Sequence, residues 1–380
     1  MRLIPGIILL GWLAGCSTET DNTEPPAELT SIEARLYLVL NWQRDTRASG
    51  NAAAYRLRPI IIGDRVYSID TGGTIKSTDA QSGKRHWNFK TGLSAITGLG
   101  GNAQVLIATS LDGDIIAYQI GEDGLERLWQ VQIDSEIRAT PVIDNDQVFV
   151  RSVDGKLRSL LASDGSEQWQ VSRRVPALSL TGNSKPLVQG GLVFAGFDDG
   201  KLVAFERANG QVAWETTISS SRGRTEVERL VDLDGDFVLR DGVIYIAAFQ
   251  GSLAAVQAVS GDVLWTRKFS SHLAIAIDQD SLYLSADDSH IWSIDRRTGS
   301  AFWKQDVLHA RKITAPSIID DKLVVADLAG YQHWFNKADG KLRGRIRPTD
   351  GRNYVRPLTW QQSVLSFDKR GFISSVSLQE

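Results

Sequence analysis

A short turn followed by an apolar run recurs eight times along the chain. The turn is usually Asp-Gly or a close variant, and the apolar run begins directly after it. The second turn residues are Gly73, Gly113, Gly155, Gly200, Gly251, Ser289, Gly330 and Gly371. The intervals between them are nearly constant, and the longest separates Gly200 from Gly251. A period of roughly 40 to 45 residues indicates a repeat fold in which similar units stack on one another.

Each unit contains four short segments that are apolar or alternate between apolar and polar residues. In the first unit these segments cover residues 60–62, 65–69, 74–78 and 85–89. Asp-Gly and Ser-Gly pairs between the segments supply the positive φ angles that hairpin turns need. No unit has the apolar stripe of a helix. Eight units of four strands predict an all-β fold, an eight-bladed β-propeller of four-stranded blades.

A tryptophan in the fourth segment predicts how the ring closes. In five units it follows the turn at one fixed distance, the distance that separates Trp87 from Gly73. The seventh unit has Gly344 at this position, and the chain ends before the eighth unit reaches it. Trp42 precedes the first turn by the same distance as Trp169 precedes the fourth. The N-terminal strand is therefore expected to complete the last blade and to remove an exposed sheet edge.

The repeated tryptophans have a structural explanation. A tryptophan at one position per blade can pack between neighbouring blades, where its large apolar area is buried. Trp292, Trp334 and Trp360 lie outside the repeat pattern. Packing is expected for these three as well, with a surface role left open.

The N-terminus has the pattern of an exported, lipid-modified protein. Residues 1–15 join a basic start to an apolar segment too short to span a membrane, which is typical of a signal peptide. The sequence LAGC resembles the lipobox of bacterial lipoproteins, so Cys16, the only cysteine, is the expected lipid attachment site. The resemblance implies three acyl chains, and Ser17 implies the outer membrane. An ordinary signal peptide with an incidental cysteine is the alternative.

The rest of the chain divides into a tether and a single domain. Residues 16–33 are polar and acidic and contain two prolines, so a flexible tether without structure is expected there. Residues 34–380 are expected to form one propeller domain. No later segment has the length and apolarity of a membrane-spanning helix.

Recognisable catalytic and cofactor motifs are missing. The formal net charge of −3 gives no basis for nucleic-acid binding. The five histidines are scattered, and none belongs to a zinc motif. Residues 232–236, DLDGD, lack the Gly and Glu that complete a calcium loop, so a solvated turn is expected. We therefore expect no catalytic residue, no metal and no cofactor, and a binding scaffold in preference to an enzyme.

Two crossings between blades are longer than the rest and follow each other in the chain. They contain residues 173–186 and 219–236. Long loops on a rigid scaffold often carry binding residues. Leu178 and Leu180 would point the same way in an extended segment, either onto the blades or toward a partner. Charged residues of the second crossing, from Arg222 to Asp234, would surround these leucines, which favours a partner over a solvated loop that caps the ring.

These two crossings carry the most specific resemblance in the sequence. PALSLTGNSKP and RTEVERLVDLDGD, in a chain with a lipobox and eight units, resemble the BamB family from about Trp42 to the end. That family supplies a lipoprotein subunit of the outer-membrane β-barrel assembly machinery (the BAM complex), on the periplasmic face. The resemblance implies that this rim binds the POTRA domains of BamA, and that unfolded outer-membrane proteins are candidate further partners.

The resemblance also implies the contact residues. Carried over by position, they are Leu178, Leu180, Thr181, Arg229, Asp232 and Asp234. Relatives often have arginine where this chain has Thr181, so a charge-assisted contact would be lost there. Either the partner differs correspondingly, or a nearby arginine replaces the contact. The candidates for that replacement are Arg173, Arg174 and Arg222.

Two other function classes stay open at this stage. The tryptophan repeat also resembles that of quinoprotein dehydrogenases, whose propellers carry pyrroloquinoline quinone and calcium. In that family the cofactor lies near a vicinal disulfide, whereas the only cysteine here is assigned to the anchor. The other class is a propeller that binds a small molecule or a glycan in its central channel.

Overall fold

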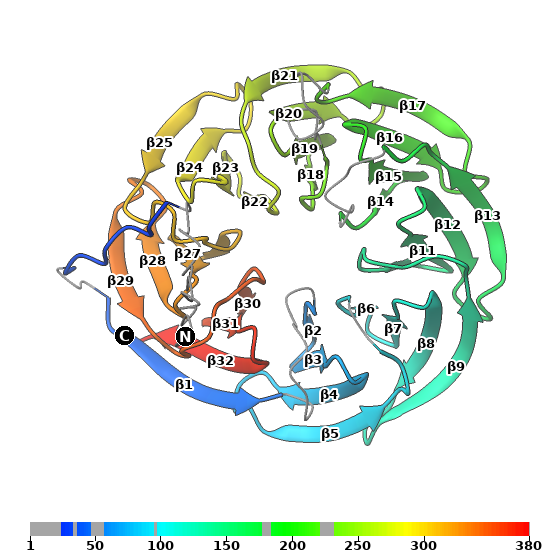
Figure 1. Cartoon of the computed structure of the whole chain (residues 1–380), viewed down its shortest axis with the longest axis horizontal. Helices are drawn as coiled ribbons and strands as arrows, with labels where there is room; N and C mark the ends of the chain where they lie inside the picture. The colour runs from blue at the N-terminus through cyan, green and yellow to red at the C-terminus, as the bar shows by residue number, and fades with distance from the viewer. Residues whose placement is uncertain are drawn as a thin grey trace, which may run out of the picture.

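Eight four-stranded antiparallel sheets form a closed ring around a central axis in the computed structural model (Figure 1). The structure describes residues 24–32, 36–46, 57–94, 97–176, 184–220 and 232–379. Strands are the only regular elements within these residues. The predicted eight-bladed β-propeller is confirmed.

The first four blades follow one another along the chain. Blade 1 contains β2 (Ile60–Ile62), β3 (Arg65–Ile69), β4 (Thr74–Asp79) and β5 (Arg85–Lys90). Blade 2 contains β6 (Gly100–Gly101), β7 (Val105–Thr109), β8 (Asp114–Ile120) and β9 (Leu125–Gln132). Blade 3 contains β10 (Val142–Asp144), β11 (Gln147–Arg151), β12 (Lys156–Leu161) and β13 (Glu167–Ser172). Blade 4 contains β14 (Leu187–Gln189), β15 (Leu192–Gly196), β16 (Lys201–Glu206) and β17 (Val212–Thr217).

The last four blades complete the ring. Blade 5 contains β18 (Val238–Arg240), β19 (Val243–Ala247), β20 (Ser252–Gln257) and β21 (Val263–Lys268). Blade 6 contains β22 (Ala276–Ile277), β23 (Ser281–Ser285), β24 (Ile291–Asp295) and β25 (Ala301–Gln305). Blade 7 contains β26 (Ser317–Ile319), β27 (Lys322–Ala326), β28 (Gln332–Asn336) and β29 (Leu342–Ile346). Blade 8 contains β30 (Leu358–Trp360), β31 (Ser363–Phe367), β32 (Phe372–Leu378) and β1 (Leu38–Asp45).

The core lies between adjacent blades and is built mainly from the two middle strands of each. In blade 5, residues 244–247 of β19 and 253–256 of β20 are all buried. Side chains on one face of these strands meet Phe194 and Leu202 of blade 4 in a shared cluster. Because both faces of a middle strand are covered, its apolar run is continuous; the outer strand β21 instead alternates exposed and partly buried residues.

The N-terminal strand closes the ring. β1 pairs antiparallel with β32, with Leu38 opposite Leu378 and Trp42 opposite Ser375. Blade 8 therefore has the strand order β30-β31-β32-β1, in which the first strand of the chain takes the outer position. The closure predicted from the position of Trp42 is confirmed.

The recurring Gly-to-Trp spacing corresponds to a joint between neighbouring blades. Trp42 of blade 8 lies against Gly83 of blade 1, and its indole Nε1 donates a hydrogen bond to the Ala80 carbonyl oxygen at 3.2 Å. A Cβ on the facing glycine would come within 2.5 to 2.8 Å of the indole in each of six such joints. The six pairs are Trp42–Gly83, Trp129–Gly165, Trp169–Gly210, Trp214–Gly261, Trp265–Gly299 and Trp303–Gly340. The predicted packing of these tryptophans between blades is confirmed.

Two blades depart from this joint for local reasons. Trp87 of blade 1 is buried, but its Nε1 has no acceptor among the described residues. Within the same residues, no heavy atom lies near the Cβ position of Gly124 in the longer hairpin of blade 2. At Gly344 of blade 7, a Cβ would instead meet Leu38 at 3.1 Å and Leu36 at 3.2 Å. In the other joints, the facing glycine lies in the hairpin that precedes the outer strand of the next blade. Blade 8 has no such hairpin, because its outer strand is β1, from the other end of the chain.

The three tryptophans outside the pattern also pack. Trp334 is fully buried, and Trp292 lies edge-on to the Phe269 ring at 6.2 Å. Trp360 donates a hydrogen bond to the Gly63 carbonyl oxygen at 2.9 Å and so links blade 8 to blade 1. Packing accounts for all three positions.

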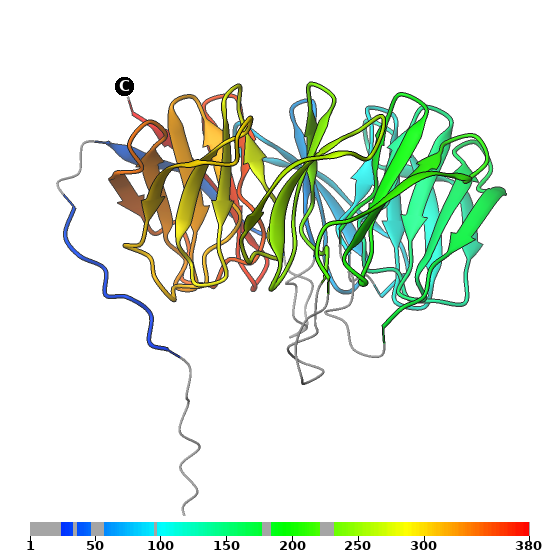
Figure 2. The same ribbon diagram turned by 90° about the horizontal axis from the view of Figure 1, so that it is seen from above.

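Residues 24–32 form part of the segment 16–33 that was predicted to be a flexible tether, and they have no regular secondary structure but contact the ring. In Figure 2 this dark blue segment starts below one face of the ring and rises beside its outer wall. The Ala27 main-chain nitrogen donates to the His309 carbonyl oxygen at 3.0 Å, and Arg311 Nη1 donates to the Ala27 carbonyl oxygen at 2.8 Å. Arg345 Nη1 donates to the Thr30 carbonyl oxygen at 3.0 Å. These contacts involve main-chain atoms of the segment, so its composition did not predict them.

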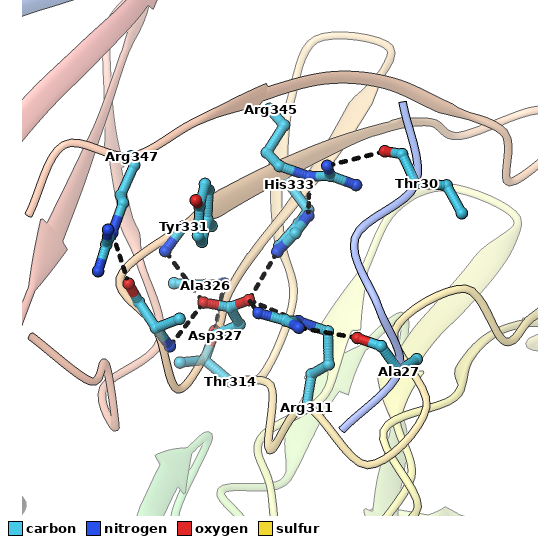
Figure 3. A network of polar contacts seen from close by, with 11 residues as sticks. Ala27, Thr30, Arg311, Thr314, Ala326, Asp327, Tyr331, His333, Arg345 and Arg347 are labelled. Carbon is cyan, nitrogen blue, oxygen red and sulfur yellow. Dashed lines mark hydrogen bonds and ion pairs between the residues drawn. The ribbon is translucent and has the colours of Figure 1, made fainter. Parts of the chain in front are cut away.

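A buried carboxylate holds both docking arginines in place (Figure 3). Arg311 pairs with Asp327 through Nε at 2.8 Å and Nη2 at 2.7 Å. His333 Nε2 lies 3.0 Å from the same Asp327 oxygen, and Arg345 Nε donates to His333 Nδ1 at 3.3 Å. Burial opposes ionisation of Asp327, but its bonds from His333, Tyr331 and Arg311 outweigh burial and lower its pKa to about 2.

Candidate functional site

Three crossings between blades are longer than the others. A crossing joins the outer strand of one blade to the inner strand of the next. We call them crossing A (46–59), crossing B (173–186) and crossing C (218–237), and each is longer than any of the other five. Crossings B and C were expected to be long, whereas crossing A, which follows the N-terminal strand, was not predicted.

Four of the predicted contact residues and the lipid site lie outside the described part of the chain. They are Leu178, Leu180, Thr181, Arg229 and Cys16. Asp232 and Asp234 are described, and their exposed fractions are 0% and 6%. The sequence predicted both on an exposed, charged rim and predicted a solvated turn over residues 232–236. The burial of Asp232 and Asp234 corrects that picture.

The end of crossing C is buried because it packs into blades 4 and 5. Leu233, between the two aspartates, belongs to the core shared by these blades, together with Phe237. A Cβ on Gly196 would lie 2.8 Å from the Leu233 side chain, so this close approach needs glycine. The Phe249 main-chain nitrogen donates to the Asp232 carbonyl oxygen at 3.0 Å. Residues 232–237 therefore form a rigid base for the crossing.

Asp236 connects the ends of all three long crossings. Its Oδ2 lies 2.5 Å from Nη1 of Arg58 in crossing A, and its Oδ1 accepts a hydrogen bond of 3.1 Å from the Lys185 main-chain nitrogen in crossing B. Burial opposes ionisation of Asp236, but the positive charges of Arg58 and Lys185 outweigh it and lower its pKa. A single carboxylate thus ties segments of blades 1, 4 and 5 together.

Crossing B is anchored at both of its described ends. Arg151 Nη1 donates to Ser184 Oγ at 3.1 Å, and Arg151 Nη2 pairs with Asp198 at 2.5 Å. The Arg151 guanidinium also lies over the Phe197 ring, 5.2 Å from its centroid. At the other end of the crossing, the Arg173 guanidinium lies 5.7 Å from the same centroid. A cation above an aromatic face is an attractive contact, more so when it is shielded from water.

The crossings surround one end of the central channel. The channel contains a cavity of about 550 Å³, whose described lining residues come from six blades and from the crossings that lead into blades 4 and 6. Its wall combines polar and apolar surface in similar amounts, with Ile61, Val142 and Val238 among the apolar lining residues. The charged lining groups, which include Asp236, precede the inner strands and so lie at the end where the crossings arrive. We call this end the channel mouth and define it by Arg58, Lys185, Asp236 and Arg356.

The described residues include no cluster able to bind a metal and no helix able to cross a membrane. No group of three or more His, Cys, Asp or Glu side chains among them is placed to hold a metal ion. None of the described segments forms a long apolar helix that could cross a membrane.

Comparison with known proteins identifies the family. The family model for outer membrane protein assembly factor BamB matches residues 71–305. A protein of that name from Burkholderia pseudomallei is 32% identical over 343 residues, which cover 89% of this chain and 87% of the relative. One from Alkalilimnicola ehrlichii is 39% identical over 306 residues, 80% of this chain and 79% of the relative. The chain belongs to the BamB family of outer-membrane protein assembly factors.

Solved structures agree with the fold. The crystal structure of BamB from Moraxella catarrhalis superimposes with a TM-score of 0.81 at 22% identity, and covers 90% of this chain and 100% of that one. A europium-containing methanol dehydrogenase has a TM-score of 0.73 at 11% identity, covering 87% of this chain and 85% of that one. The likeness to the dehydrogenase therefore concerns the fold alone, and the resemblance to the BamB family is confirmed.

Sequence reasoning missed the residues that organise the site. Arg58, Arg151, Lys185 and Asp236 come from four separate parts of the chain. Arg151 holds the end of crossing B through Ser184, and Arg58 and Lys185 meet Asp236 only in the folded ring. One signal was available, since Asp236 lies in the same DLDGD stretch that was interpreted as a solvated turn. Its partners, however, are separated from it by 51 and 178 residues.

Proposed function

We propose that this chain is a non-enzymatic scaffold subunit of the outer-membrane β-barrel assembly machinery. The face of the ring that contains the channel mouth, which we call the crossings face, binds the periplasmic POTRA domains of BamA. The scaffold assists the assembly and insertion of β-barrel proteins. Membership of the BamB family supports this role, because the relatives are named assembly factors. The observation that carries the proposal is the convergence of three long crossings on Asp236 at one end of a rigid ring.

Crossing B supplies the apolar part of the contact. Leu178 and Leu180 lie between Arg173 and Ser184, whose positions are both held on the Arg151–Phe197 joint. A loop with fixed ends has fewer conformations to lose when a partner binds, which favours affinity. The two leucines fill an apolar pocket of BamA, while Thr181 and Arg229 contact its polar edge.

Crossing C has a positioning role in this proposal. Asp232 and Asp234 are buried, so they hold the base of the crossing and do not have to reach BamA themselves. Replacement of either aspartate would then change the binding of BamA through the position of Arg229. This assignment differs from the direct acidic contact that the sequence suggested.

The lipid anchor on Cys16 places the same face toward the membrane-bound partner. Glu24 and Ala27 lie against His309 and Arg311, which belong to the crossing between blades 6 and 7. The segment therefore leaves the ring at the crossings face. From Cys16 to Glu24 the fully extended chain spans at most about 29 Å, which limits the distance of the anchor from this point. The chain is lipid-anchored on the periplasmic face of the outer membrane.

Affinity purification from detergent-solubilised outer membrane tests the proposal. BamA is expected to co-purify with the intact protein and to be lost from the Leu178→Ala/Leu180→Ala variant. Loss of such an anchor weakens binding by about 2 kcal/mol or more, roughly 30-fold. The matched control is Leu128→Ala/Leu264→Ala, which removes two leucines that are 43% and 53% exposed on outer strands. Retention of BamA by the first variant, or equal loss in both, would remove these leucines from the site.

A further inference from the structure

The channel mouth contains more positive than negative charge. Arg58, Lys185 and Arg356 line the cavity there, and Asp236 is the one carboxylate among the described lining residues. His272 also lines the cavity, but its Nδ1 contacts Asp287 at 2.7 Å. Arg58 is paired with Asp236, so the positive charges of Lys185 and Arg356 are in excess over the carboxylates that line the mouth. Such an excess inside a concave surface attracts anions.

Arg356 is held in place by neutral acceptors. Its Nε donates to Ser317 Oγ at 3.1 Å, and its Nη1 donates to the Ile275 carbonyl oxygen at 3.4 Å. Across the described ranges, no carboxylate lies within 4.0 Å of this guanidinium. Burial lowers the pKa of Arg356, Asp236 opposes this shift and Arg58 adds to it. Arg356 is partly buried, and a cation that is partly withdrawn from water without an ion-pair partner carries a desolvation cost that an incoming anion would relieve.

Lys185 offers a second cation at the same mouth. Its main-chain nitrogen is bound to Asp236, which fixes the backbone from which the side chain extends. The Lys185 residue is exposed, and its ammonium group makes no ion pair within the described part of the chain. One fixed guanidinium and one extendable ammonium suit a carboxylate, because Arg binds it through a planar fork and Lys through a mobile charge.

The space available is that of a small-ligand pocket. A cavity of about 550 Å³ falls within the range typical of such pockets, and its wall offers both apolar contact surface and polar groups that could orient a ligand. We infer that the channel mouth is a carboxylate-binding site formed by Arg356 and Lys185 within the central cavity. This site is distinct from the leucines of crossing B and does not depend on the binding of BamA.

Two sources can supply the carboxylate. One is a small free dicarboxylate, which would occupy the cavity; the other is an acidic side chain of a polypeptide lying across the crossings face. Calorimetric titration of the full chain in detergent at pH 7 and low ionic strength distinguishes them. The probes are succinate and the capped peptide acetyl-Gly-Glu-Gly-amide, whose only carboxylate is a side chain. Sodium chloride at matched ionic strength measures the nonspecific effect of salt.

Variants connect the binding to the mouth. Arg356→Gln and Lys185→Gln are each expected to weaken binding roughly tenfold, because each removes one charge-assisted hydrogen bond. Arg297→Gln is the control, since it removes one positive charge from a side chain that is 72% exposed on blade 6. Lys185 is exposed, so its variant tests the site even if Arg356→Gln does not fold.

The outcomes separate clearly. Saturable binding of succinate alone identifies a free ligand, binding of the peptide alone identifies a polypeptide, and binding of both identifies a general carboxylate site. Each supports the inference if Lys185→Gln weakens it and Arg297→Gln does not. Absence of saturable binding for both probes, or the same affinity in the Lys185 variant as in the parent, would overturn it. Loss of BamA binding in the leucine variant has no bearing on this result.

Discussion

The Lys185 main-chain nitrogen donates a hydrogen bond to the Asp236 side chain, with 3.1 Å between the nitrogen and Oδ1. The two residues are the returning ends of consecutive long crossings, so this bond fixes the spacing of the loops that we propose bind BamA. The second oxygen of Asp236 pairs with Arg58 across the channel mouth. The Asp236 side chain therefore fixes the ends of crossings A, B and C relative to one another.

Replacement of Asp236 separates its charge from its hydrogen bond. Asp236→Ala removes both contacts and leaves a main-chain donor without its acceptor, so we expect it to lower the free energy of unfolding by about 1–3 kcal/mol. Asp236→Asn keeps an acceptor for Lys185 but loses the ion pair with Arg58, and is expected to be less damaging. Urea unfolding measures both, and BamA co-purification reports the position of the loops. Equal stability of Asp236→Ala and the parent would show that the bond does not hold the crossings.

The buried network around Asp327 predicts a loss of stability in acid. Its pKa is about 2 in the folded protein, below the ordinary value of 3.8. A lowered pKa stabilises the folded state above pH 4, and this contribution disappears as the pH falls from about 4 to about 2. Asp327→Asn should lack this part of the pH dependence. Unfolding by urea at pH 2, 3, 4 and 5 checks the prediction. The same change of unfolding free energy with pH in the parent and in Asp327→Asn would contradict it.

His333 extends the pH dependence toward neutrality. Burial lowers the pKa of His333, so the folded state holds the neutral ring that accepts from Arg345. Its contribution is complete above the ordinary value of 6.5 and decreases as the pH falls below it, because the unfolded chain then binds the proton more readily. His333→Asn should therefore lose less stability than the parent between pH 7 and pH 5. Guanidinium unfolding at these two pH values gives the comparison, and a parent that is insensitive to this range would refute it.

The joint between blades predicts a strong effect of a single methyl group. Gly299 has φ of 73°, and a Cβ there would lie 2.8 Å from the Trp265 ring. Gly63 has φ of 62° but no heavy atom within 4 Å of its Cβ position. Both alanine variants bear the cost of a left-handed backbone, but only Gly299→Ala is also overpacked, by about 1–3 kcal/mol. Thermal unfolding of the two variants measures the difference, and equal melting temperatures would argue against the joint.

Docking of residues 24–32 can be measured directly. Spin labels at Ser31→Cys and Lys341→Cys, in a Cys16→Ser background, should give a narrow distance distribution. Arg345→Gln should broaden it, because the hydrogen bond to the Thr30 carbonyl oxygen is lost. Arg343→Gln on the same strand is the matched control, since Arg343 pairs with Asp339 and not with the segment. A distribution that is already broad in the parent would mean that the segment is not docked in solution.

The ring could be predicted from the sequence because the local structure of each repeat is determined by residues within that repeat or the next one. Glycines at positive φ, short apolar runs and one tryptophan per unit depend on neighbours within the same unit or the next one. Even the closure by Trp42 followed from counting, since the unit length is nearly constant. Local rules repeated eight times leave little freedom for the global arrangement.

The site could not be predicted in the same way. Asp232 and Asp234 were predicted to be exposed because charged residues usually lie on the surface. The composition of the segment does not show that Leu233, between them, packs in the core. The docking of residues 24–32 depends in part on Arg311 and Arg345, which lie far along the chain and bind main-chain oxygens that every sequence possesses. Short sequence patterns do not predict contacts between residues that are so far apart in the chain.

The sequence by itself determined the number of blades, the order of the strands, the closure of the ring and the family. Only the tertiary structure decided that Asp236 joins Arg58 and Lys185, and that Arg356 lies at the same mouth with neutral partners. The physical reason is range. Turn and strand preferences act over a few residues, whereas the charges at the channel mouth meet because closing a ring brings together the starts of inner strands from distant parts of the chain.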